Sequence, residues 1–393
     1  MKNKWQRKIL EDVCEFVGGS QPPKSTFSFE EKKEYVRLIQ IRDYKSENYK
    51  VYVKKNSTKK FCTADDVMIG RYGPPVFQIL KGLTGAYNVA LMKAVPDESQ
   101  ITKDFLYHFL QTPNIQEYII SLSERAAGQS GVNKGALNEY PIYIPLIPEQ
   151  KRIVKILDEA FAAIEKAKEN AEKNLKNSKE LFDSYLQSVF AKPGKDWEER
   201  RLEDLGTITS SKRIYKKEYV KKGVPFYRTK EIKELANSKS VSTKLYITEE
   251  RYSVIKKSFG VPSEGDILLT AIGTIGEMYI VNNNEKFYFK DGNVLWFKNF
   301  KSVDTIYLKF ILLSFVEHIK RLAIGSAYNA LPIEKLKKYK VKLPLLKEQK
   351  LIVSKLNSLS QETKKLETIY NQKLGDLDEL KKSILQKAFS GEL

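Results

Sequence analysis

Few residues in this chain could support catalysis, and their spacing falls short of what the chemistry needs. A phosphate-binding P-loop requires Gly-x4-Gly-Lys-Ser/Thr, because backbone amides hold the phosphates and the lysine reaches them. Gly18 lies upstream of Lys24 and Ser25, but Pro23 stands where the second glycine belongs. We therefore predict an ordinary loop at this position.

Two further catalytic strings are incomplete. An amino-methyltransferase is expected to carry Asn/Asp-Pro-Pro-aromatic, whereas the chain has Gln21–Lys24 and Gly73–Val76, which read Gln-Pro-Pro-Lys and Gly-Pro-Pro-Val. A nuclease of the Pro-Asp…Asp/Glu-x-Lys type could begin at Pro96-Asp97, but the second half of that motif does not follow within range.

Histidine and cysteine are too sparse and too scattered to form a zinc site. The chain has only His108, His318, Cys14 and Cys62. Structural zinc needs four such ligands at close spacing, so we expect no metal and two reduced, buried cysteines. Without a nucleophile and base at matching spacing, we predict that the chain is not an enzyme and binds no cofactor.

Charge gives the first positive indication of function. Lys and Arg outnumber Asp and Glu by 68 to 49, a net charge of +19. Of this excess, +16 falls in residues 1–148 and 193–343, outside the two segments described below as helices. Such an excess favours a polyanionic partner, most often nucleic acid, although a basic surface can also serve solubility. The N-terminus lacks the apolar stretch of a signal peptide, and we expect a cytoplasmic protein.

The elements that must position any binding residue form an internal repeat of about 195 residues. Four strings recur in the same order, which makes chance similarity an unsatisfactory explanation. The pairs are Trp5…Val13 with Trp197…Leu205, Asp66–Ile69 with Asp266–Leu269, Ile144–Lys151 with Leu343–Lys350, and Ser184–Phe190 with Ser383–Phe389.

Each repeat is predicted to contain a mixed α/β domain followed by one long helix. Apolar runs between Gly, Pro and Asn punctuation indicate strands at Tyr35–Ile39, Val67–Ile69 and Asp266–Thr270, and helices are expected at Phe105–Ser121 and Ile306–Arg321. The fold class is α+β, in four parts: domain 1 at 1–147, a helix at 148–192, domain 2 at 193–342 and a second helix at 343–393.

The two long helices carry heptad patterns, which predict an antiparallel coiled coil related by a pseudo-two-fold axis. Each would be roughly 60 Å long at 1.5 Å per residue. A fully aligned register would make the two numbers of every facing pair sum to 537, with Asn174 facing Thr363 as a polar layer. Packing of each helix on its own domain is the alternative. The predicted seam residues are Ile153, Leu157, Ile164, Asn174, Leu181, Ile352, Leu356, Thr363, Leu366, Leu377 and Ile384.

The whole chain resembles the specificity subunit of type I restriction–modification enzymes. The strings Ile144–Val154 and Leu343–Val353 are similar to the family's Pro-Glu-Gln entry into its conserved helices. Gly223–Ile232, Gly265–Gly276 and Gly85–Leu91 are similar to strings of its target-recognition domains. The first domain departs from this pattern: Tyr72–Pro75 replaces the counterpart of Gly273–Gly276, and no copy of Gly223–Ile232 is evident.

The resemblance implies two target-recognition domains separated by two conserved helices. Each domain would read one half of a bipartite site in double-stranded DNA, and the helices would set the gap and dock two methyltransferase (modification) subunits. Restriction and translocation subunits would join through these, and S-adenosylmethionine, ATP and Mg would act in the partner subunits. The departures in the first domain imply that the two domains read different sequences.

Residues that can reach bases or phosphates mark candidate DNA-binding loops, because Arg and Lys suit guanine or phosphate and Asn and Gln suit adenine. The candidates are Gln21, Lys24, Arg42, Arg71, Tyr72, Gln129, Asn133, Lys134, Lys212, Arg213, Tyr215, Lys216, Arg228, Lys230, Tyr328 and Asn329.

Three other interpretations remain open at this stage. The chain could be the specificity partner of a related, type IIB/IIG-like restriction system, which genomic neighbours would distinguish. It could be a coiled-coil scaffold with basic nucleic-acid-binding lobes, which predicts no sequence preference in DNA. A stand-alone nuclease would cleave DNA by itself, and the missing motifs argue against it.

Overall fold

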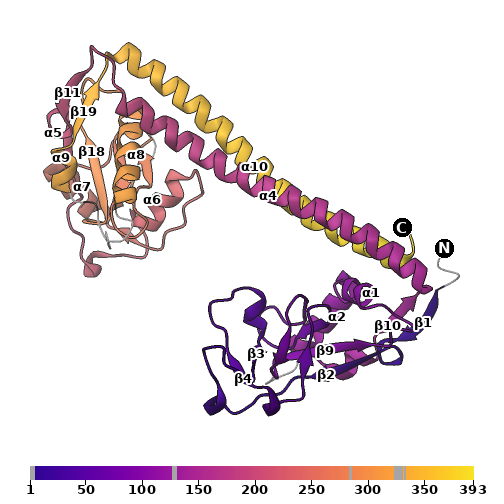
Figure 1. Ribbon diagram of the computed structural model, residues 1–393. Helices are drawn as coiled ribbons and strands as arrows, with labels where there is room; N and C mark the ends of the chain where they lie inside the picture. Colours follow the sequence, from indigo (N-terminus) through magenta and orange to yellow (C-terminus); the bar gives the residue numbers. More distant parts are fainter. Residues whose placement is uncertain (1–4, 126–130, 283–285, 323–330, 332) are drawn as a thin grey trace. The chain divides into compact units, whose positions relative to one another are not determined.

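The computed structural model describes residues 5–125, 131–282, 286–322, 331 and 333–393. Its contacts divide the chain into unit 1, residues Met1–Glu172 with Asn371–Leu393, and unit 2, residues Lys173–Tyr370. Each unit holds one α/β lobe and parts of two helices of 45 residues, α4 (Ile147–Ala191) and α10 (Leu346–Ser390) (Figure 1). The prediction of one long helix after each mixed domain is therefore confirmed.

The first lobe, β1 to β10, contains two four-stranded sheets and one strand pair. One sheet has the order β2-β9-β6-β7, and the other has β4-β3-β8-β5 with β3 and β8 parallel. Strand β1 pairs with β10 and so joins the two ends of the lobe. The bounds are β1 Gln6–Ile9, β2 Cys14–Gly18, β3 Tyr35–Ile39, β4 Tyr52–Lys54, β5 Phe61–Cys62, β6 Val67–Gly70, β7 Gln78–Leu80, β8 Gly85–Tyr87, β9 Leu91–Pro96 and β10 Pro141–Ile144.

The second lobe, β11 to β19, repeats this plan. Its sheets have the orders β12-β18-β15-β16 and β14-β13-β17, with β13 and β17 parallel, and β11 pairs with β19. The internal repeat seen in the sequence is thus a repeat of topology. The bounds are β11 Glu198–Arg201, β12 Thr207–Thr209, β13 Val224–Tyr227, β14 Tyr246–Ile247, β15 Ile267–Thr270, β16 Met278–Ile280, β17 Tyr288–Phe289, β18 Val294–Lys298 and β19 Lys340–Leu343.

The strands predicted from short apolar runs are confirmed, because such runs suit strands covered on both faces. All four residues of β6 and of β15 are buried. The second predicted helix matches α8 (Thr305–Leu322), but the first is broken into α1 (Lys103–Phe109) and α2 (Pro113–Arg125). Pro113 explains the break, since proline cannot donate within a helix and is tolerated at its start.

Short helices connect the strands. They are α3 Lys134–Asn138, α5 Leu202–Leu205, α6 Thr229–Ala236, α7 Glu249–Ser258 and α9 Ile333–Lys337, with 3-10 turns η2 Leu10–Asp12, η3 Lys24–Thr26, η4 Ile41–Tyr44, η5 Lys55–Ser57 and η6 Lys216–Glu218. None of the helices in the described ranges is long and apolar enough to cross a membrane.

Both long helices contribute to the core of each lobe. In unit 1, Leu157 of α4 and Leu385 of α10 pack with Phe105 of α1 in one buried cluster. In unit 2, Leu186 of α4 and Leu356 of α10 pack with Leu312 of α8. The pairing of helices and the packing of helices on lobes, posed as alternatives from the sequence, therefore occur together within each unit.

A buried glutamine explains why Glu-Gln recurs at the start of both long helices. Gln150 is fully buried, and its side chain donates to the carbonyl oxygens of Gln100 (2.8 Å) and Pro145 (2.9 Å) and accepts from the Thr102 N–H (2.9 Å). Thr102 caps α1, so this one side chain ties the lobe to the start of α4.

The second repeat has the same arrangement at Gln349. Its side chain donates to the carbonyl oxygens of Ser302 (3.2 Å) and Pro344 (2.9 Å) and accepts from the Asp304 N–H (2.8 Å). A buried amide with every polar atom bonded stabilises the structure, whereas an unmade bond there is costly.

The predicted seam of α4 is right in its first half and wrong in its second half. Ile153, Leu157 and Ile164 are buried, but Asn174 is exposed and Leu181 is 49% exposed. The next residues along, Leu175 and Phe182, are half-buried instead. A shift of one residue turns a helix by about 100°, so the larger apolar neighbours occupy the seam.

The seam of α10 is confirmed at Leu356 and Thr363, which are buried, while Leu366 is 36% exposed. Ile352, Leu377 and Ile384 are half-buried. The predicted Asn174–Thr363 polar layer is wrong, because Asn174 faces solvent and the Thr363 hydroxyl donates to carbonyl oxygens of its own helix, Leu359 and Ser360.

The predicted register is also wrong in unit 1. It places Leu380 opposite Leu157, yet Leu380 is 46% exposed, and Leu385 and Ala388 lie in the cluster around Leu157. Lys168 pairs with Asp378 (2.5 Å) and Lys381 with Glu165 (3.3 Å), which confirms the antiparallel direction. The helices are therefore offset from the fully aligned seam.

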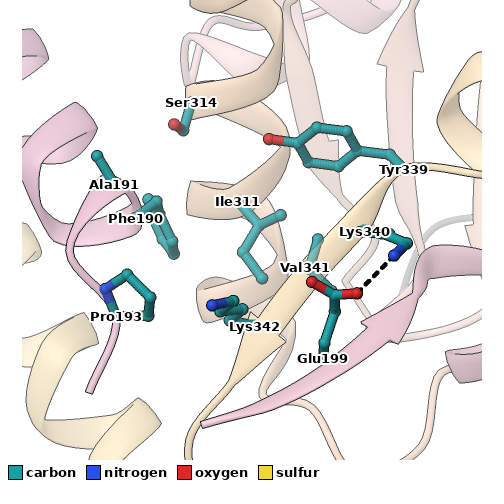
Figure 2. Close-up of a pocket in the computed structure, with 10 residues that line it drawn as sticks. All are labelled: Phe190, Ala191, Pro193, Glu199, Ile311, Ser314, Tyr339, Lys340, Val341 and Lys342. Carbon is teal, nitrogen blue, oxygen red and sulfur yellow. Dashed lines mark hydrogen bonds and ion pairs between the residues drawn. The ribbon is translucent and has the colours of Figure 1, made fainter. Parts of the chain in front are cut away.

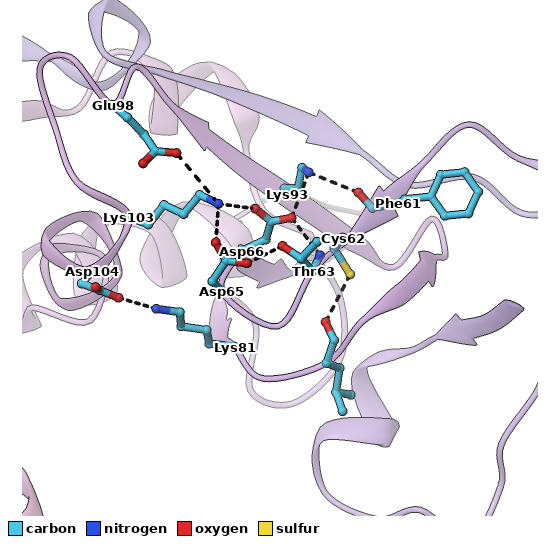
Figure 3. Close-up of polar contacts among 11 residues, drawn as sticks. Phe61, Cys62, Thr63, Asp65, Asp66, Lys81, Lys93, Glu98, Lys103 and Asp104 are labelled. Atoms are coloured by element: carbon cyan, nitrogen blue, oxygen red, sulfur yellow. Dashed lines mark hydrogen bonds and ion pairs between the residues drawn. The ribbon is translucent and has the colours of Figure 1, made fainter.

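Three lysines of the first lobe are neutralised by aspartates and serve its structure. Asp66 accepts from the Thr63 N–H (2.9 Å) and pairs with Lys93 and Lys103, each at 3.0 Å, as Figure 3 shows. Lys81 pairs with Asp104 in the same view. Since their charges are already compensated, we do not count these lysines as anchors for a polyanion.

Both cysteines are free and buried, as predicted. Burial raises the pKa of the Cys14 thiol to about 12 and that of Cys62 to about 11, so neither is a reactive thiolate at neutral pH. The ring of His108 is buried as well, and its Nε2 lies 2.9 Å from a carboxylate oxygen of Asp158 on α4.

Candidate nucleic-acid interface

In each lobe the carboxyl ends of four strands meet at one edge. Strands β2 and β6 are both antiparallel to β9, and β3 is parallel to β8, so each pair ends at the same side. We call the loops after β2, β3, β6 and β8, with residues 131–134, the first rim. Backbone hydrogen bonds join these loops: Ser20 N–H to Tyr87 O, Asn88 N–H to Ile39 O, Arg71 N–H to Ala90 O and Val132 N–H to Arg71 O.

The second rim is built from the equivalent loops after β12, β13, β15 and β17, with Leu331. Its loops are joined by Lys290 N–H to Tyr227 O, Ala271 N–H to Asn293 O, Leu331 N–H to Ala271 O, and the Ser211 hydroxyl to Phe289 O. A backbone frame shared by both lobes, whose loops carry different side chains, is the usual arrangement of a binding site carried by a scaffold.

Arg71 and Tyr72 are two predicted residues that the structure places side by side in the first rim. The Arg71 guanidinium lies 5.2 Å from the centre of the Tyr72 ring, and its Nη1 donates to the Val89 carbonyl at 3.4 Å. Tyr72 is 40% exposed and bridges to Gly131. A stacked guanidinium beside an exposed aromatic ring suits contact with nucleic acid.

The other predicted residues of the first lobe differ in what they do. The Asn133 side chain accepts from the Ala136 N–H (3.1 Å), so it caps α3, and Lys134 is exposed in the turn that follows. Arg42 is exposed and lies over the ring of Tyr49, 5.7 Å from its centre. Gln21 and Lys24 are exposed at and beyond the first rim, and Gln129 lies outside the described residues.

Two arginines of the second rim are held by acidic residues. The Arg213 Nε donates to Asp291 at 2.7 Å, and Arg228 pairs with Glu231 at 3.1 Å. The arginine side chains are 65% and 50% exposed, whereas those of Asp291 and Glu231 are 12% and 1% exposed. These hydrogen bonds raise the pKa of both guanidinium groups and fix their orientation at the surface.

A hollow of about 670 Å³ lies against these arginines. It is lined by four basic residues, two tyrosines, an asparagine and two aliphatic residues, namely Arg213, Ile214, Tyr215, Lys216, Tyr219, Arg228, Leu245, Lys290 and Asn293. The sequence had predicted four of these residues as DNA-binding. The structure brings them together and adds Tyr219, Lys290 and Asn293.

A hydrogen bond to a buried tyrosine anchors the backbone beside this hollow. The Tyr288 hydroxyl accepts from the Lys212 N–H at 2.7 Å, and burial raises the pKa of Tyr288 to about 12, so the hydroxyl keeps its proton. The Lys212 side chain is exposed, and Lys230 pairs with Glu234 on α6 at 3.6 Å. Tyr328 and Asn329 lie outside the described residues.

The first lobe does contain a counterpart of Gly223–Ile232, which the sequence did not reveal. Strand β3 is followed by η4, where Asp43 accepts from the Gln40 N–H at 2.6 Å, as Glu231 accepts from the Arg228 N–H at 2.8 Å after β13. The string was overlooked because it shares almost no side chains with its copy. Likewise, Tyr72–Pro75 occupies the same β6–β7 loop that Gly273–Gly276 occupies between β15 and β16.

A second hollow in unit 2, of about 230 Å³, is lined by residues outside the rim (Figure 2). Its walls include Phe190, Ile311 and Val341, with the Glu199–Lys340 ion pair (2.7 Å) at one side. Within the described residues no group of three or more His, Cys, Asp or Glu side chains could hold a metal ion. The hollow at the second rim, with its four basic residues, therefore remains the candidate for a polyanion.

The family model described as the type I restriction modification DNA specificity domain matches residues 2–173 and 194–374, one match per repeat. A putative type I restriction enzyme specificity subunit of Haemophilus influenzae is 29% identical over 283 residues, covering 70% of this chain and 67% of the relative. The EcoBI specificity subunit of Escherichia coli is 23% identical over 427 residues, covering 99% and 86%.

Solved structures share the fold. The HsdS subunit of Thermoanaerobacter tengcongensis superposes with a TM-score of 0.64 at 18% identity and covers 100% of this chain and 98% of its own. A chain from a study of assembly and conformational transition of the type I R-M system superposes with a TM-score of 0.80, also at 18% identity, with 100% and 99% covered.

Proposed function

This chain belongs to the family of type I restriction–modification DNA specificity domains, and from that membership we propose how it selects its target. It is a sequence-specific DNA-recognition subunit. Each rim reads one half of a bipartite site in double-stranded DNA, and α4 and α10 fix the number of base pairs between the halves. The supporting observation is that both lobes form their rims from equivalent loops but fill them with different side chains.

The chemistry belongs to partner subunits in this proposal. Methyl transfer and cleavage, with S-adenosylmethionine, ATP and Mg, would take place on modification and restriction subunits that this chain directs to DNA. Matching leucines at the starts of the long helices suit such partners: Leu146 is 77% exposed and its repeat equivalent, Leu345, is 82% exposed. Exposed apolar side chains at equivalent positions favour two copies of one partner, the modification subunit.

The docking proposal is tested by co-purification with the modification subunit. Leu146→Asp and Leu345→Asp should each lower the retained partner to one copy, and the double variant should retain none, because a buried carboxylate at an apolar contact is costly. Leu380→Asp, an exposed leucine of α10 away from both helix starts, is the matched control. Full retention in the double variant would refute this docking surface.

Target reading is tested by mapping methylated adenines genome-wide in cells with and without the intact gene. We expect one bipartite motif with a fixed gap that disappears without the gene. A single continuous motif, or an unchanged methylation pattern, would contradict the proposal.

A further inference from the structure

We infer that Arg213 and Arg228 are guanine readers, and that Asp291 and Glu231 are the positioning residues that determine this specificity. The inference rests on the proposed function, since it assumes that the second rim meets DNA. It assigns two bases to the second half-site, one guanine for Arg213 and one for Arg228.

Charge compensation separates these arginines from phosphate anchors. Affinity for phosphate comes from uncompensated positive charge that displaces counterions. Arg213 already faces Asp291 at 2.7 Å, and Arg228 faces Glu231 at 3.1 Å, so each pair carries little net charge. Their value to DNA binding is therefore directional donation, which suits the two acceptors of guanine.

The geometry leaves these donors available on Arg213, whereas Arg228 already donates from its Nη2 to Glu231 and keeps its Nη1. Arg213 uses its Nε for Asp291, and among the described residues nothing bonds its two terminal nitrogens, the pair that can span O6 and N7 of guanine. Glu231 is 1% exposed and holds both the backbone N–H and the guanidinium of Arg228. A donor oriented before binding loses less conformational entropy on contact.

Lysines beside the arginines can supply the phosphate contacts. The side chains of Lys212 and Lys216 are exposed, and within the described part of the chain neither forms an ion pair. Lys216 and Arg213 line the same hollow, with Tyr215 between them in sequence and 57% exposed. The second rim thus contains two arginines compensated by carboxylates, which suit bases, and two free lysines, Lys212 and Lys216, which suit phosphates. Lys290 belongs to neither group, because it shares Asp291 with Arg213 at 3.5 Å.

The test uses the complex with its modification subunits and a duplex library randomised over the target, sequenced after selection at several salt concentrations. Arg213→Ala should lower affinity for the preferred site on the order of 10- to 100-fold, abolish a guanine preference at one position and leave the salt dependence unchanged. Lys216→Ala, the matched control, should weaken binding to all sequences equally. It should also reduce by about one the salt slope, which is the slope of the logarithm of affinity against the logarithm of salt concentration.

Asp291→Asn gives the discriminating result, because a merely structural role would not produce it. Freeing the Arg213 charge should strengthen binding to arbitrary DNA and steepen the salt slope, while the guanine preference weakens; Asp291→Glu should restore that preference. The inference is wrong if Arg213→Ala lowers the salt slope and leaves every base preference intact. Absence of any base preference in the unaltered complex would instead refute the proposed function.

Discussion

The two rims use one backbone frame to present cations in opposite ways. In the second rim, both exposed arginines are held by carboxylates, of which Glu231 is buried and Asp291 is partly buried. In the first rim, Arg71 stacks on Tyr72, and Asp43, the counterpart of Glu231, pairs with Arg37 of β3 at 3.6 Å instead of with a rim residue. The shared frame fixes the position of a cation at the rim, and in our proposal the nearest acid determines whether that cation acts on DNA through its net charge or through directed hydrogen bonds.

Loss of the buried glutamine should lower the stability of both lobes by a similar amount. Gln150→Ala and Gln349→Ala should each lower the stability of their own unit by about 2–4 kcal/mol, because three hydrogen bonds are lost and buried partners remain unsatisfied. Hydrogen exchange of amides in β6 and β15 measures the two units separately.

Leucine substitutions at the two positions serve as size-matched controls for these glutamines and should destabilise to a similar extent. A cost confined to one lobe would break the premise that the two frames are equivalent.

The two rims differ at the equivalent positions Gly19 and Ser211. Exchanging glycine and serine at these positions should lower stability by different amounts in the two units. A Cβ on Gly19 would lie 2.0 Å from the Asn88 carbonyl oxygen, so Gly19→Ser forces a backbone shift and should cost about 1–3 kcal/mol. Ser211, at the equivalent position, donates to Phe289 O at 2.6 Å, and Ser211→Gly should cost about 1 kcal/mol.

Denaturant unfolding followed at single tryptophans, Trp5 for unit 1 and Trp296 for unit 2, measures both changes. If Gly19→Ser proves neutral, the close approach of the two loops is not required by the first rim.

The contrast in charge compensation should appear as a contrast in salt dependence. Arg71→Ala removes an arginine with no acidic partner among the described residues and should reduce the salt slope of binding by about one, whereas Arg213→Ala should leave it unchanged. Fluorescence titration of the complex on one duplex at several salt concentrations measures both. Equal salt slopes for the two variants would contradict the proposed difference between the rims.

The smallest expected effect is on the pH dependence of stability, which should differ between the two units. Burial lowers the pKa of His108, against the opposing hydrogen bond to Asp158, so the unfolded chain takes up a proton more readily than the folded one. Stability contributed by neutral His108 is fully present above pH 6.5 and is lost as pH falls below that value. Exchange of β6 amides, corrected for intrinsic rates, should therefore accelerate more than that of β15 amides between pH 7.5 and 5.5.

His108→Gln should flatten this dependence, while His318→Gln serves as the control for the other histidine. A dependence that persists in His108→Gln would assign the titration to another group.

Sequence reasoning captured what depends on local pattern and missed what depends on long-range pairing. The repeat, the long helices and the strands at β3, β6 and β15 follow from apolar periodicity and punctuation. The seam was misplaced because Ala160, Ala167 and Asn174 fit a 4-3 spacing as well as their neighbours do. The bulk of Phe161, Leu175 and Phe182 was the signal that would have corrected it.

At the site, the sequence identified Arg213, Tyr215, Lys216 and Arg228 because they cluster within two short strings. Lys290, Asp291 and Asn293 were missed, since only the parallel pairing of β13 with β17 brings that loop to the arginines. Glu231 was visible as part of a family-like string, but its role as a buried acid depends on its 1% exposure. The DNA contacts of all these residues remain predictions.

The aromatic contacts of Phe389 have a consequence for synthesis on the ribosome. Its ring lies 4.9 Å from Phe105 and 5.5 Å from Phe109, and Leu385 and Ala388 fill the same cluster. The lobe translated first therefore completes its core last, after the whole of the second lobe has emerged. A premature stop codon in α10 would damage the lobe encoded at the opposite end of the gene.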